Sequence, residues 1–390
     1  MTRIAWIGFQ VLDQTLSKTA LFEISDHLAK RGNKVDFFGL RSKKIIDTRN
    51  LYMRILAVPL RSFPFLTHLF YIATIGLILP IYVLLKRPNF VITEPKFGSI
   101  VFGLILLIFP FRLRPKTIMD VRSTPVELEG IRALLGKIAF NNSVAISKKI
   151  FDGFTIVTNN MKTELVNQFN IKNKAMRVWT NGVNLELFNN SLYDGHKIKE
   201  QMSLGDKFVV FYHGSISAER GILEAIESIG KLRDSYPDIV LFLIGSVSGL
   251  ALIEEQIRKL DLQNKVIIHA SVDYAEVPKY ISMSDLCLVP LPNAPSWRYQ
   301  CPLKLLEYMS MGKPVIAVEM PANREVLGDS NFAVIVPKAD PEEFAKAIIY
   351  AYKNIEQLRI TSAEGKLIIQ ERYDWRKIAQ KFEMFLDEFN

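Results

Sequence analysis

The sequence has few of the residues from which disulfide frameworks and zinc sites are built. Cys287 and Cys301 are the only cysteines among its 390 residues. Two cysteines supply neither a set of disulfides nor the cysteine pairs of a zinc site, so we expect a reducing compartment. The first residues, MTRIAWIGFQ, hold too short an apolar run for a secretory signal and predict a first strand instead. Both observations argue against a secreted protein.

Two signatures of nucleotide-related proteins are also missing. The loop after the first predicted strand, GFQVLDQTLSK, contains no GxGxxG, the glycine pattern of dinucleotide-binding proteins. The net charge is +9, but the lysines and arginines are scattered among acidic residues and form no stripe with spaced aromatics. The sequence therefore argues against an NAD-dependent enzyme and against a nucleic-acid partner. A preference for phosphorylated ligands or an anionic membrane fits this charge better.

The composition that is present is that of a folded protein with more than one core. Apolar residues make up 49 % of the chain and charged residues 23 %, which argues against disorder. A chain of 390 residues is too long for one core of average size, so we expect two domains. Short apolar strands alternate with helices at residues 4–38 and again from residue 208 onward. This repetition predicts an α/β protein with two doubly wound parallel sheets.

The longest apolar segment lies in the first half of the chain. Residues 65–85 carry no formal charge and are long enough to cross a bilayer, whereas residues 100–111 are too short to cross alone. Three interpretations stay open: a helix and loop that dip into one leaflet, an ordinary buried helix, and a spanning hairpin. The hairpin keeps the flanking basic residues on one side but places Glu94 and Lys96 in hydrocarbon. Length and flanking charge favour the first interpretation.

Polar residues follow the strand predicted to end at Asp120. In VRSTPVE, Arg122, Ser123 and Thr124 would meet a ligand at the carboxyl edge of the sheet. The alternative is local, because Ser123 or Thr124 would cap a helix with Glu127 in its first turn. The helix that follows, residues 131–149, has the apolar spacing of a core helix at Leu134, Leu135, Ile138, Ala139 and Val144.

The stretch CPLKLLEYMSMGKPVIAV, residues 301–318, combines a helix, a carboxylate and a buried strand. Pro302 suits the first turn of a helix, and residues 315–318 form an apolar run typical of a strand covered on both faces. Glu307 is then held on a helix at the edge of a parallel sheet, where ligands bind and helix N-termini attract phosphates. Alternatively, Lys304 and Glu307 are an ordinary i,i+3 pair on a solvated helix face.

A second candidate loop is HGSISAERG, residues 213–221, between a predicted strand and helix. Gly214 allows a close approach of the backbone to a ligand. Arg220 and the helix N-terminus beyond it supply positive charge for a phosphate. Upstream of this loop, the strand in RVWTNGV breaks at Asn181-Gly182, and a polar connection leads into the second series of strands and helices.

These motifs resemble those of the GT-B glycosyltransferases of family 4, retaining enzymes that move a sugar from a nucleotide-diphosphate donor. The resemblance covers nearly the whole chain and is most specific in the second half. It is carried by the linker TNGVNLELF, the phosphate loop HGSISAERG, the strand YISMSDLCLVP, the donor motif CPLKLLEYMSMGKPVIA and the C-terminal helix ERYDWRKIAQKFEMFL.

The resemblance implies a GT-B fold, in which two doubly wound Rossmann-like domains face each other across a cleft. Residues 1–178 would form the acceptor domain, with a membrane-associating apolar segment at about 65–111. Residues 179–370 would form the nucleotide-sugar donor domain, and residues 371–390 a helix that crosses back to the first domain. The protein would be cytoplasmic, as a peripheral or monotopic protein on the inner face of the membrane.

The resemblance also implies residue roles. Glu307 matches the second Glu of the Glu-x7-Glu motif, which holds the ribose hydroxyls of the nucleotide. Arg220 and Lys304 would stabilise the departing diphosphate, and Asp120 would approach the sugar or acceptor. The other expected donor contacts are Gly214, Ser215, Gly221, Tyr299, Pro302 and Leu303, and the residues expected at the acceptor or cleft are Arg122 and Asn181. No Asp-x-Asp stands at a strand end, so neither a metal nor another cofactor is expected besides the nucleotide-sugar substrate.

The chain departs from the family pattern at three places. Tyr299 stands where the family has its first motif Glu, Ser215 stands where the phosphate loop has an Arg, and the first loop lacks a Gly-Gly pair. The expected activity is a retaining, metal-independent hexosyltransfer to a lipid-linked or membrane-associated glycan. Two alternatives remain: a nucleotide-sugar 2-epimerase of the same fold, and a non-catalytic scaffold subunit at a membrane, which the residues at positions 299 and 215 favour.

Overall fold

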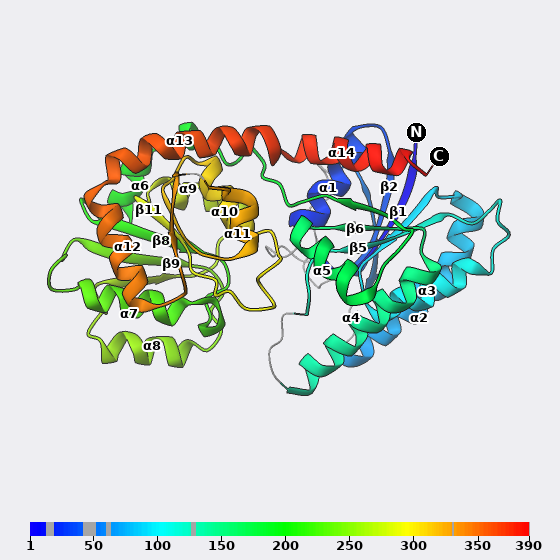
Figure 1. Cartoon of the computed structure of the whole chain (residues 1–390), viewed down its shortest axis with the longest axis horizontal. Helices are drawn as coiled ribbons and strands as arrows, with labels where there is room; N and C mark the ends of the chain where they lie inside the picture. Colours follow the sequence, from blue (N-terminus) through cyan, green and yellow to red (C-terminus); the bar gives the residue numbers. More distant parts are fainter. Residues whose placement is uncertain (13–18, 42–51, 60–63, 126–129, 330, 390) are drawn as a thin grey trace. The chain divides into compact units, whose positions relative to one another are not determined.

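The computed structural model describes the whole chain except residues 13–18, 42–51, 60–63, 126–129, 330 and 390 (Figure 1). The chain divides into two compact units. Unit 1 consists of residues 1–180 together with 375–390, and unit 2 consists of residues 181–374. The sequence predicts this boundary between residues 178 and 179 and the start of the returning segment at residue 371.

Over its described residues, unit 1 is built on a seven-stranded sheet in the order β3-β2-β1-β4-β5-β6-β7, with every pair parallel. Its strands are β1 (Arg3–Leu12), β2 (Lys34–Arg41), β3 (Arg54–Pro59), β4 (Phe90–Thr93), β5 (Lys116–Val121), β6 (Gly153–Ile156) and β7 (Ala175–Val178). Its helices are α1 (Thr19–Lys30), α2 (Pro64–Lys86), α3 (Phe97–Leu107), α4 (Gly130–Ile150), α5 (Asn159–Phe169) and α14 (Trp375–Asp387).

The described part of unit 2 holds a six-stranded parallel sheet in the order β10-β9-β8-β11-β12-β13. Its strands are β8 (Phe208–His213), β9 (Ile239–Ile244), β10 (Val266–His269), β11 (Leu286–Val289), β12 (Val315–Val318) and β13 (Ala333–Val336). Its helices are α6 (Gly195–Gln201), α7 (Ile222–Leu232), α8 (Leu250–Lys259), α9 (Val277–Ser282), α10 (Leu303–Ser310), α11 (Pro321–Leu327), α12 (Pro341–Lys353) and α13 (Ile355–Arg372). The predicted α/β class with two doubly wound parallel sheets is confirmed.

Alternation of side chains along β1 explains how the sheet of unit 1 is covered on both faces. In β1, Ala5 and Ile7 pack in one cluster with Tyr71 of α2, whereas Trp6 stacks on Phe382 of α14 with ring centres 5.6 Å apart. Successive residues of a strand point to opposite faces, so α2 and α14 cover opposite sides of the sheet. The C-terminal helix α14 is therefore part of the core of unit 1.

The long apolar run of the sequence forms α2, which is buried along one side only. Tyr71, Ile75 and Leu79 are buried against the sheet, whereas Leu77 and Leu85 are about three-quarters exposed, at 75 % and 74 %. Over residues 69–86 this helix is long and apolar enough to cross a bilayer, with 28 % of that stretch buried. The spanning hairpin is nevertheless wrong, because α2 packs on the sheet and the following strand β4 pairs with β1 and β5 inside it.

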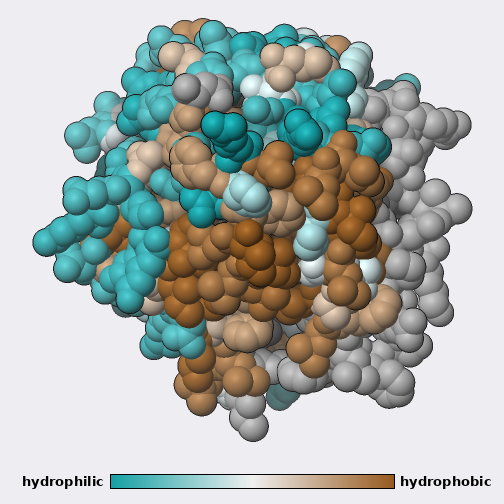
Figure 2. All heavy atoms as spheres, turned by 90° about the vertical axis from the view of Figure 1, so that its right-hand side faces the viewer, coloured by the Kyte–Doolittle hydropathy of each residue, from teal (hydrophilic) through white to brown (hydrophobic). Residues whose placement is uncertain are grey.

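The expectation that α4 is a plain core helix is also wrong in part. Val144 is buried, but Leu134, Leu135 and Ile138 are exposed. Because α4 packs beside α3 and α3 beside α2, their exposed apolar side chains lie on neighbouring helices. Figure 2 shows apolar side chains gathered over this part of unit 1. We call this surface the apolar face; it comprises Leu69, Leu77, Ile78, Ile81, Leu84, Leu85, Phe97, Leu104, Leu107, Ile108, Phe111, Leu134, Leu135, Ile138 and Ile146.

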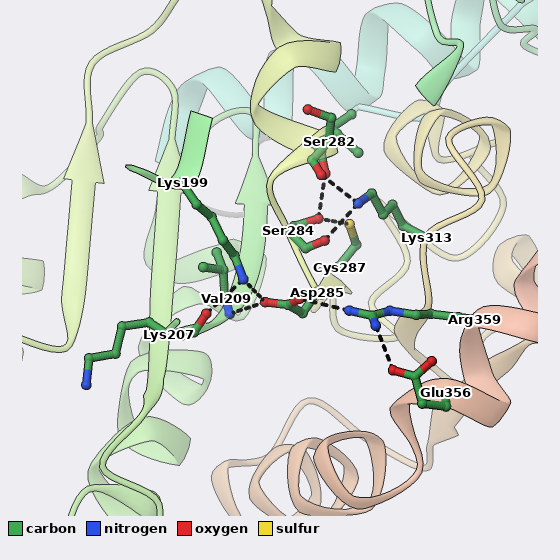
Figure 3. Close-up of polar contacts among 11 residues, drawn as sticks. Lys199, Lys207, Val209, Ser282, Ser284, Asp285, Cys287, Lys313, Glu356 and Arg359 are labelled. Atoms are coloured by element: carbon green, nitrogen blue, oxygen red, sulfur yellow. Dashed lines mark hydrogen bonds and ion pairs between the residues drawn. The ribbon is translucent and has the colours of Figure 1, made fainter. Parts of the chain in front are cut away.

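At the amino-terminal end of β11 in unit 2, Asp285 joins three elements (Figure 3). Its carboxylate accepts hydrogen bonds from Lys199 Nζ of α6 at 2.6 Å, from the backbone N–H of Val209 in β8 at 2.9 Å and from Arg359 of α13 at 3.1 Å. Three donors converge on one carboxylate, so the cluster ties two helices to the sheet. It lies at the end of β11 opposite to the one that carries the candidate site.

Candidate functional site

The loops after β8 and β9 meet at two glycines. Gly214 has φ +118° and Gly245 has φ +151°, both in the region that favours glycine. A Cβ atom added to Gly245 would lie 1.8 Å from the carbonyl oxygen of Gly214, so no other residue fits there without displacement. Gly214 was predicted from the sequence and Gly245 was missed, although IGSVSG at the end of β9 carries the same kind of glycine signal.

Gly221 brings the β8 loop against the loop that follows β11. It has φ +74°, and an added Cβ would lie 2.2 Å from the carbonyl oxygen of Pro290. This close approach holds the preceding residue, Arg220, near the carboxyl end of β11. There the guanidinium carbon of Arg220 lies 4.6 Å from the ring centre of Trp297. The arginine is thus anchored by a cation–π contact, and it also hydrogen-bonds to the hydroxyl of Tyr212. A planar guanidinium is suited to bind an anion.

Lys304 lies in the first turn of α10, whose N-cap is Pro302 and whose first residue is Leu303. The lysine is buried, and its Nζ lies 4.8 Å from the ring centre of Tyr212. Burial, and then the positive charge of Arg220, lower the pKa of Lys304 to about 7, while nearby Glu307 acts in the opposite direction. Two cationic groups and a helix N-terminus therefore converge on one side of the β8 loop.

Glu307 is buried in the second turn of α10, with 2 % of its surface exposed. Its Oε2 lies 2.7 Å from Nε2 of His213, and its Oε1 accepts a hydrogen bond of 2.6 Å from Tyr274. The interpretation of Lys304 and Glu307 as a pair on a solvated helix face is therefore wrong, because both side chains are buried. His213 and Tyr274 were missed: no local pattern pairs either of them with Glu307.

Three further predicted site residues belong to unit 2: Ser215 and Tyr299, which were expected at the donor, and Asn181, which was expected at the acceptor or cleft. The carbonyl oxygen of Ser215 accepts a hydrogen bond from Tyr212 Oη at 2.7 Å. Asn181 donates from Nδ2 to the carbonyl oxygen of Cys301 at 2.7 Å, which ties the start of unit 2 to the segment just before α10. Tyr299 lies half-buried in the loop between β11 and α10. Within the described residues, no group of three or more His, Cys, Asp or Glu side chains is arranged to hold a metal ion.

Asp120 and Arg122 form a separate cluster in unit 1. Asp120 Oδ1 accepts hydrogen bonds from Thr155 at 2.8 Å and from Trp179 Nε1 at 2.9 Å. Burial raises the pKa of Asp120 to about 6, against the lowering effect of Arg122. The guanidinium of Arg122 lies 3.6 Å from the ring centre of Trp179 and donates to that residue's carbonyl oxygen. The alternative of a helix cap with Glu127 in its first turn falls outside the described residues.

Two models of protein families match the chain, one in each half. The model described as Glycosyltransferase Family 4 matches residues 18–187. The model described as Glycosyl transferases group 1 matches residues 195–367. The second match contains the β8 loop, the β11 loop and α10, which together carry the cluster around Glu307.

Individual proteins are similar to the chain over shorter stretches. Alpha-D-kanosaminyltransferase of Streptomyces kanamyceticus is 26 % identical over 153 residues, which are 39 % of this chain and 38 % of that protein. Phosphatidyl-myo-inositol mannosyltransferase of Mycobacterium leprae is 25 % identical over 204 residues, which are 52 % of this chain and 50 % of that protein. The chain thus matches half or less of the length of these two relatives.

A solved structure is similar over the full length. HepE of Anabaena, crystallised in complex with UDP-glucose, is 15 % identical, with a TM-score of 0.80 and 100 % of both chains covered. At this identity the likeness shows the fold alone, and it extends over the whole chain.

Proposed function

Because this chain belongs to the GT-B glycosyltransferases of family 4, we propose that it moves a sugar from a nucleotide-diphosphate donor to an acceptor hydroxyl with retention of anomeric configuration. The observation that carries the proposal is the convergence of Arg220, Lys304 and Glu307 at the carboxyl ends of β8 and β11. Two cations suit a diphosphate, and a buried carboxylate suits a pair of sugar hydroxyls.

The proposed chemistry is mainly electrostatic. Arg220, Lys304 and the N-terminus of α10 stabilise the negative charge that develops on the departing diphosphate. Glu307 holds the ribose hydroxyls and so positions the diphosphate of the donor beside these cations. The acceptor oxygen then bonds to the anomeric carbon on the face from which the diphosphate leaves, and the acceptor proton passes to the leaving phosphate. No side-chain nucleophile, metal or other cofactor is required in this scheme.

The remaining predicted residues are assigned supporting roles in this proposal. Gly214, Ser215 and Gly221 bring backbone close to the diphosphate. Tyr299, in place of a carboxylate, contacts the donor sugar through its ring and hydroxyl. In unit 1, Asp120 and Arg122 serve the acceptor. HepE was crystallised in complex with UDP-glucose, so uracil and glucose are the first base and sugar to test.

The acceptor is proposed to be lipid-linked, and the protein to bind the cytoplasmic membrane surface through its apolar face. The name of the mycobacterial relative gives phosphatidyl-myo-inositol as its acceptor. Three neighbouring helices of unit 1 expose apolar side chains, and exposed basic residues border them at Lys86, Arg87 and Arg112. Apolar burial in the interface together with attraction to anionic lipid is the pattern of a peripheral protein.

A donor panel tests the activity. Thermal shifts with UDP-, GDP- and dTDP-sugars identify the bound donor, because a ligand that binds only the native state raises its melting temperature. With that donor, Glu307→Ala and Arg220→Ala are each expected to lower turnover about 10-fold or more, through loss of a charged contact of about 1.5–3 kcal/mol. Near-normal turnover in either variant would show that the altered residue is not part of the site. Isomerised sugar instead indicates an epimerase, and no binding indicates a scaffold.

Vesicle flotation tests the membrane contact. The wild-type protein is expected to float with vesicles of phosphatidylcholine and phosphatidylglycerol, and less with phosphatidylcholine alone. Leu77→Asp with Leu85→Asp is expected to abolish flotation, because two charges then lie on the apolar face that would contact the membrane. The matched control is Leu250→Asp with Leu252→Asp, two exposed leucines of α8 in unit 2. Equal loss in both double variants, or no flotation of the wild type, contradicts the membrane proposal.

A further inference from the structure

His213 is buried between Glu307 and Tyr308, at the point where β8 meets α10. Its Nε2 lies 2.7 Å from Glu307 Oε2, and its Nδ1 lies 3.0 Å from Tyr308 Oη. We propose that His213 is a positioning residue that orients the Glu307 carboxylate toward the ribose hydroxyls of the donor. This inference rests on the proposed function, in which Glu307 is the ribose ligand. It assigns a role to a histidine that the reaction scheme leaves unused.

The partners of Tyr308 define where the hydrogen of the imidazole lies. Tyr308 Oη accepts a hydrogen bond of 3.1 Å from the backbone N–H of His213, which can only donate. Its own hydrogen is then directed at Nδ1, since no other acceptor for it lies among the described residues. Burial raises the pKa of Tyr308 well above its usual value, so the hydroxyl keeps that hydrogen. With Nδ1 as acceptor, the neutral ring carries its hydrogen on Nε2 and donates it to Glu307.

The imidazole ring is held in place by aromatic neighbours. Strand alternation puts Phe211 and His213 on the same face of β8, with their rings stacked at 6.1 Å between centres. The ring of Tyr308 meets that of His213 edge-on at 5.1 Å. A ring fixed on two sides and hydrogen-bonded at both nitrogens has one orientation, so it presents Nε2 to the carboxylate at a constant angle.

Each oxygen of Glu307 is left with capacity for a ligand. Oε2 accepts one hydrogen bond from His213 and Oε1 accepts one from Tyr274. A carboxylate oxygen accepts two hydrogen bonds, so a second position on each oxygen remains for the two neighbouring hydroxyls of a ribose. Without a hydrogen-bond donor on Oε2, the Glu307 carboxylate rotates more freely about its Cγ–Cδ bond. Binding of the ribose must then restrict this rotation, which costs binding free energy.

The test compares ribose with deoxyribose nucleotides. Dissociation constants are measured calorimetrically for UDP and 2′-deoxy-UDP, and for GDP and 2′-deoxy-GDP. The wild-type protein is expected to prefer the ribonucleotide of one pair by about 10-fold, the effect of one charged hydrogen bond. In His213→Phe, which keeps a planar ring but lacks both nitrogens, the preference is expected to fall to about 2-fold, with the affinity for the deoxynucleotide little changed.

Two further variants separate positioning from packing. His213→Gln places an amide donor near the position of Nε2 and is expected to retain most of the ribose preference. His196→Phe, the same kind of substitution at an exposed histidine of α6, is expected to leave the preference unchanged. A purely structural role for His213 would lower the melting temperature of the unliganded protein without altering the ratio of the two dissociation constants.

The outcomes distinguish this inference from the proposed function. A ribose preference in the wild type that survives in full in His213→Phe overturns the positioning role alone. Equal binding of both nucleotides by the wild type overturns the ribose contact of Glu307, and the role of His213 with it. If His213→Phe does not fold, Tyr308→Phe decides, because it removes only the hydroxyl that sets the hydrogen of the imidazole. The ribose preference of Tyr308→Phe is expected to be about 3-fold smaller than that of the wild type, and an unchanged preference overturns the inference.

Discussion

The ammonium group of Lys304 lies 4.8 Å from the centre of the Tyr212 ring and is buried at the N-terminus of α10. Desolvation and the charge of Arg220 lower its pKa to about 7, so at higher pH the lysine of the unliganded protein loses its proton. A bound diphosphate favours the charged form. We therefore expect binding of a nucleoside diphosphate to take up a proton. The affinity for the nucleoside diphosphate is expected to decrease above about pH 7, by up to tenfold for each further pH unit.

Calorimetry in two buffers with different ionisation enthalpies measures this proton uptake directly. Lys304→Arg is the control, because an arginine stays protonated and its variant is expected to bind without uptake. Affinity that stays level between about pH 7.5 and 9 in the wild type would show that Lys304 remains charged when the site is empty.

Trp297 is expected to strengthen donor binding by holding Arg220 in place. The guanidinium carbon of Arg220 lies 4.6 Å from the centre of the Trp297 ring. Trp297→Leu removes the ring and leaves the arginine free to adopt other rotamers. A cation–π contact contributes about 0.5–2 kcal/mol, so KM for the nucleotide sugar is expected to rise about 2-fold to 30-fold. Trp297→Phe keeps an aromatic face and is expected to lose less. Steady-state kinetics with both variants measures this, and an equal KM for the two would argue against the contact.

Two glycines with nearly the same φ allow the cost of backbone strain to be measured apart from the cost of a steric collision. Gly221 has φ +74° and Gly249 has φ +72°, and each is the N-cap of a helix. An added Cβ at residue 221 would lie 2.2 Å from the carbonyl oxygen of Pro290, whereas at residue 249 it meets nothing within 4 Å. Both alanine variants carry the cost of a positive φ, about 1 kcal/mol, and Gly221→Ala adds a collision with backbone.

Urea denaturation is expected to show Gly221→Ala to be the less stable of the two variants. It is also expected to bind the nucleotide sugar more weakly, because Arg220 is the adjacent residue. Equal loss of stability in both variants would mean that the β8 loop moves away from the β11 loop at little cost.

The two sheets and the place of Glu307 on a helix at the edge of one of them were accessible from sequence because they follow from local patterns. Apolar runs such as residues 315–318 and the proline before α10 report backbone structure within a few residues. The partners of Glu307 were not accessible. His213 lies 94 residues away and Tyr274 lies 33 residues away, and only the packing of β8, α10 and the loop after β10 brings them together.

The exposed face of α4 shows a second limit of local patterns. Leu134, Leu135 and Ile138 have the spacing of core residues, and periodicity identifies an apolar side without saying what covers it. The same holds for α2, where Tyr71 faces the sheet and Leu77 faces outward. Whether such a surface meets protein or solvent depends on which neighbouring elements have already covered the sheet.

Asp285 is expected to contribute to the stability of unit 2, because three donors from separate elements converge on its carboxylate (Figure 3). Asp285→Ala leaves the half-buried ammonium of Lys199 and the buried N–H of Val209 without this acceptor. The expected loss in the free energy of unfolding is about 2–4 kcal/mol, measured by urea denaturation. The matched control is Asp238→Ala, which removes the exposed ion pair with Lys207 and should change stability little. Similar losses in both variants would contradict a special role for the Asp285 cluster.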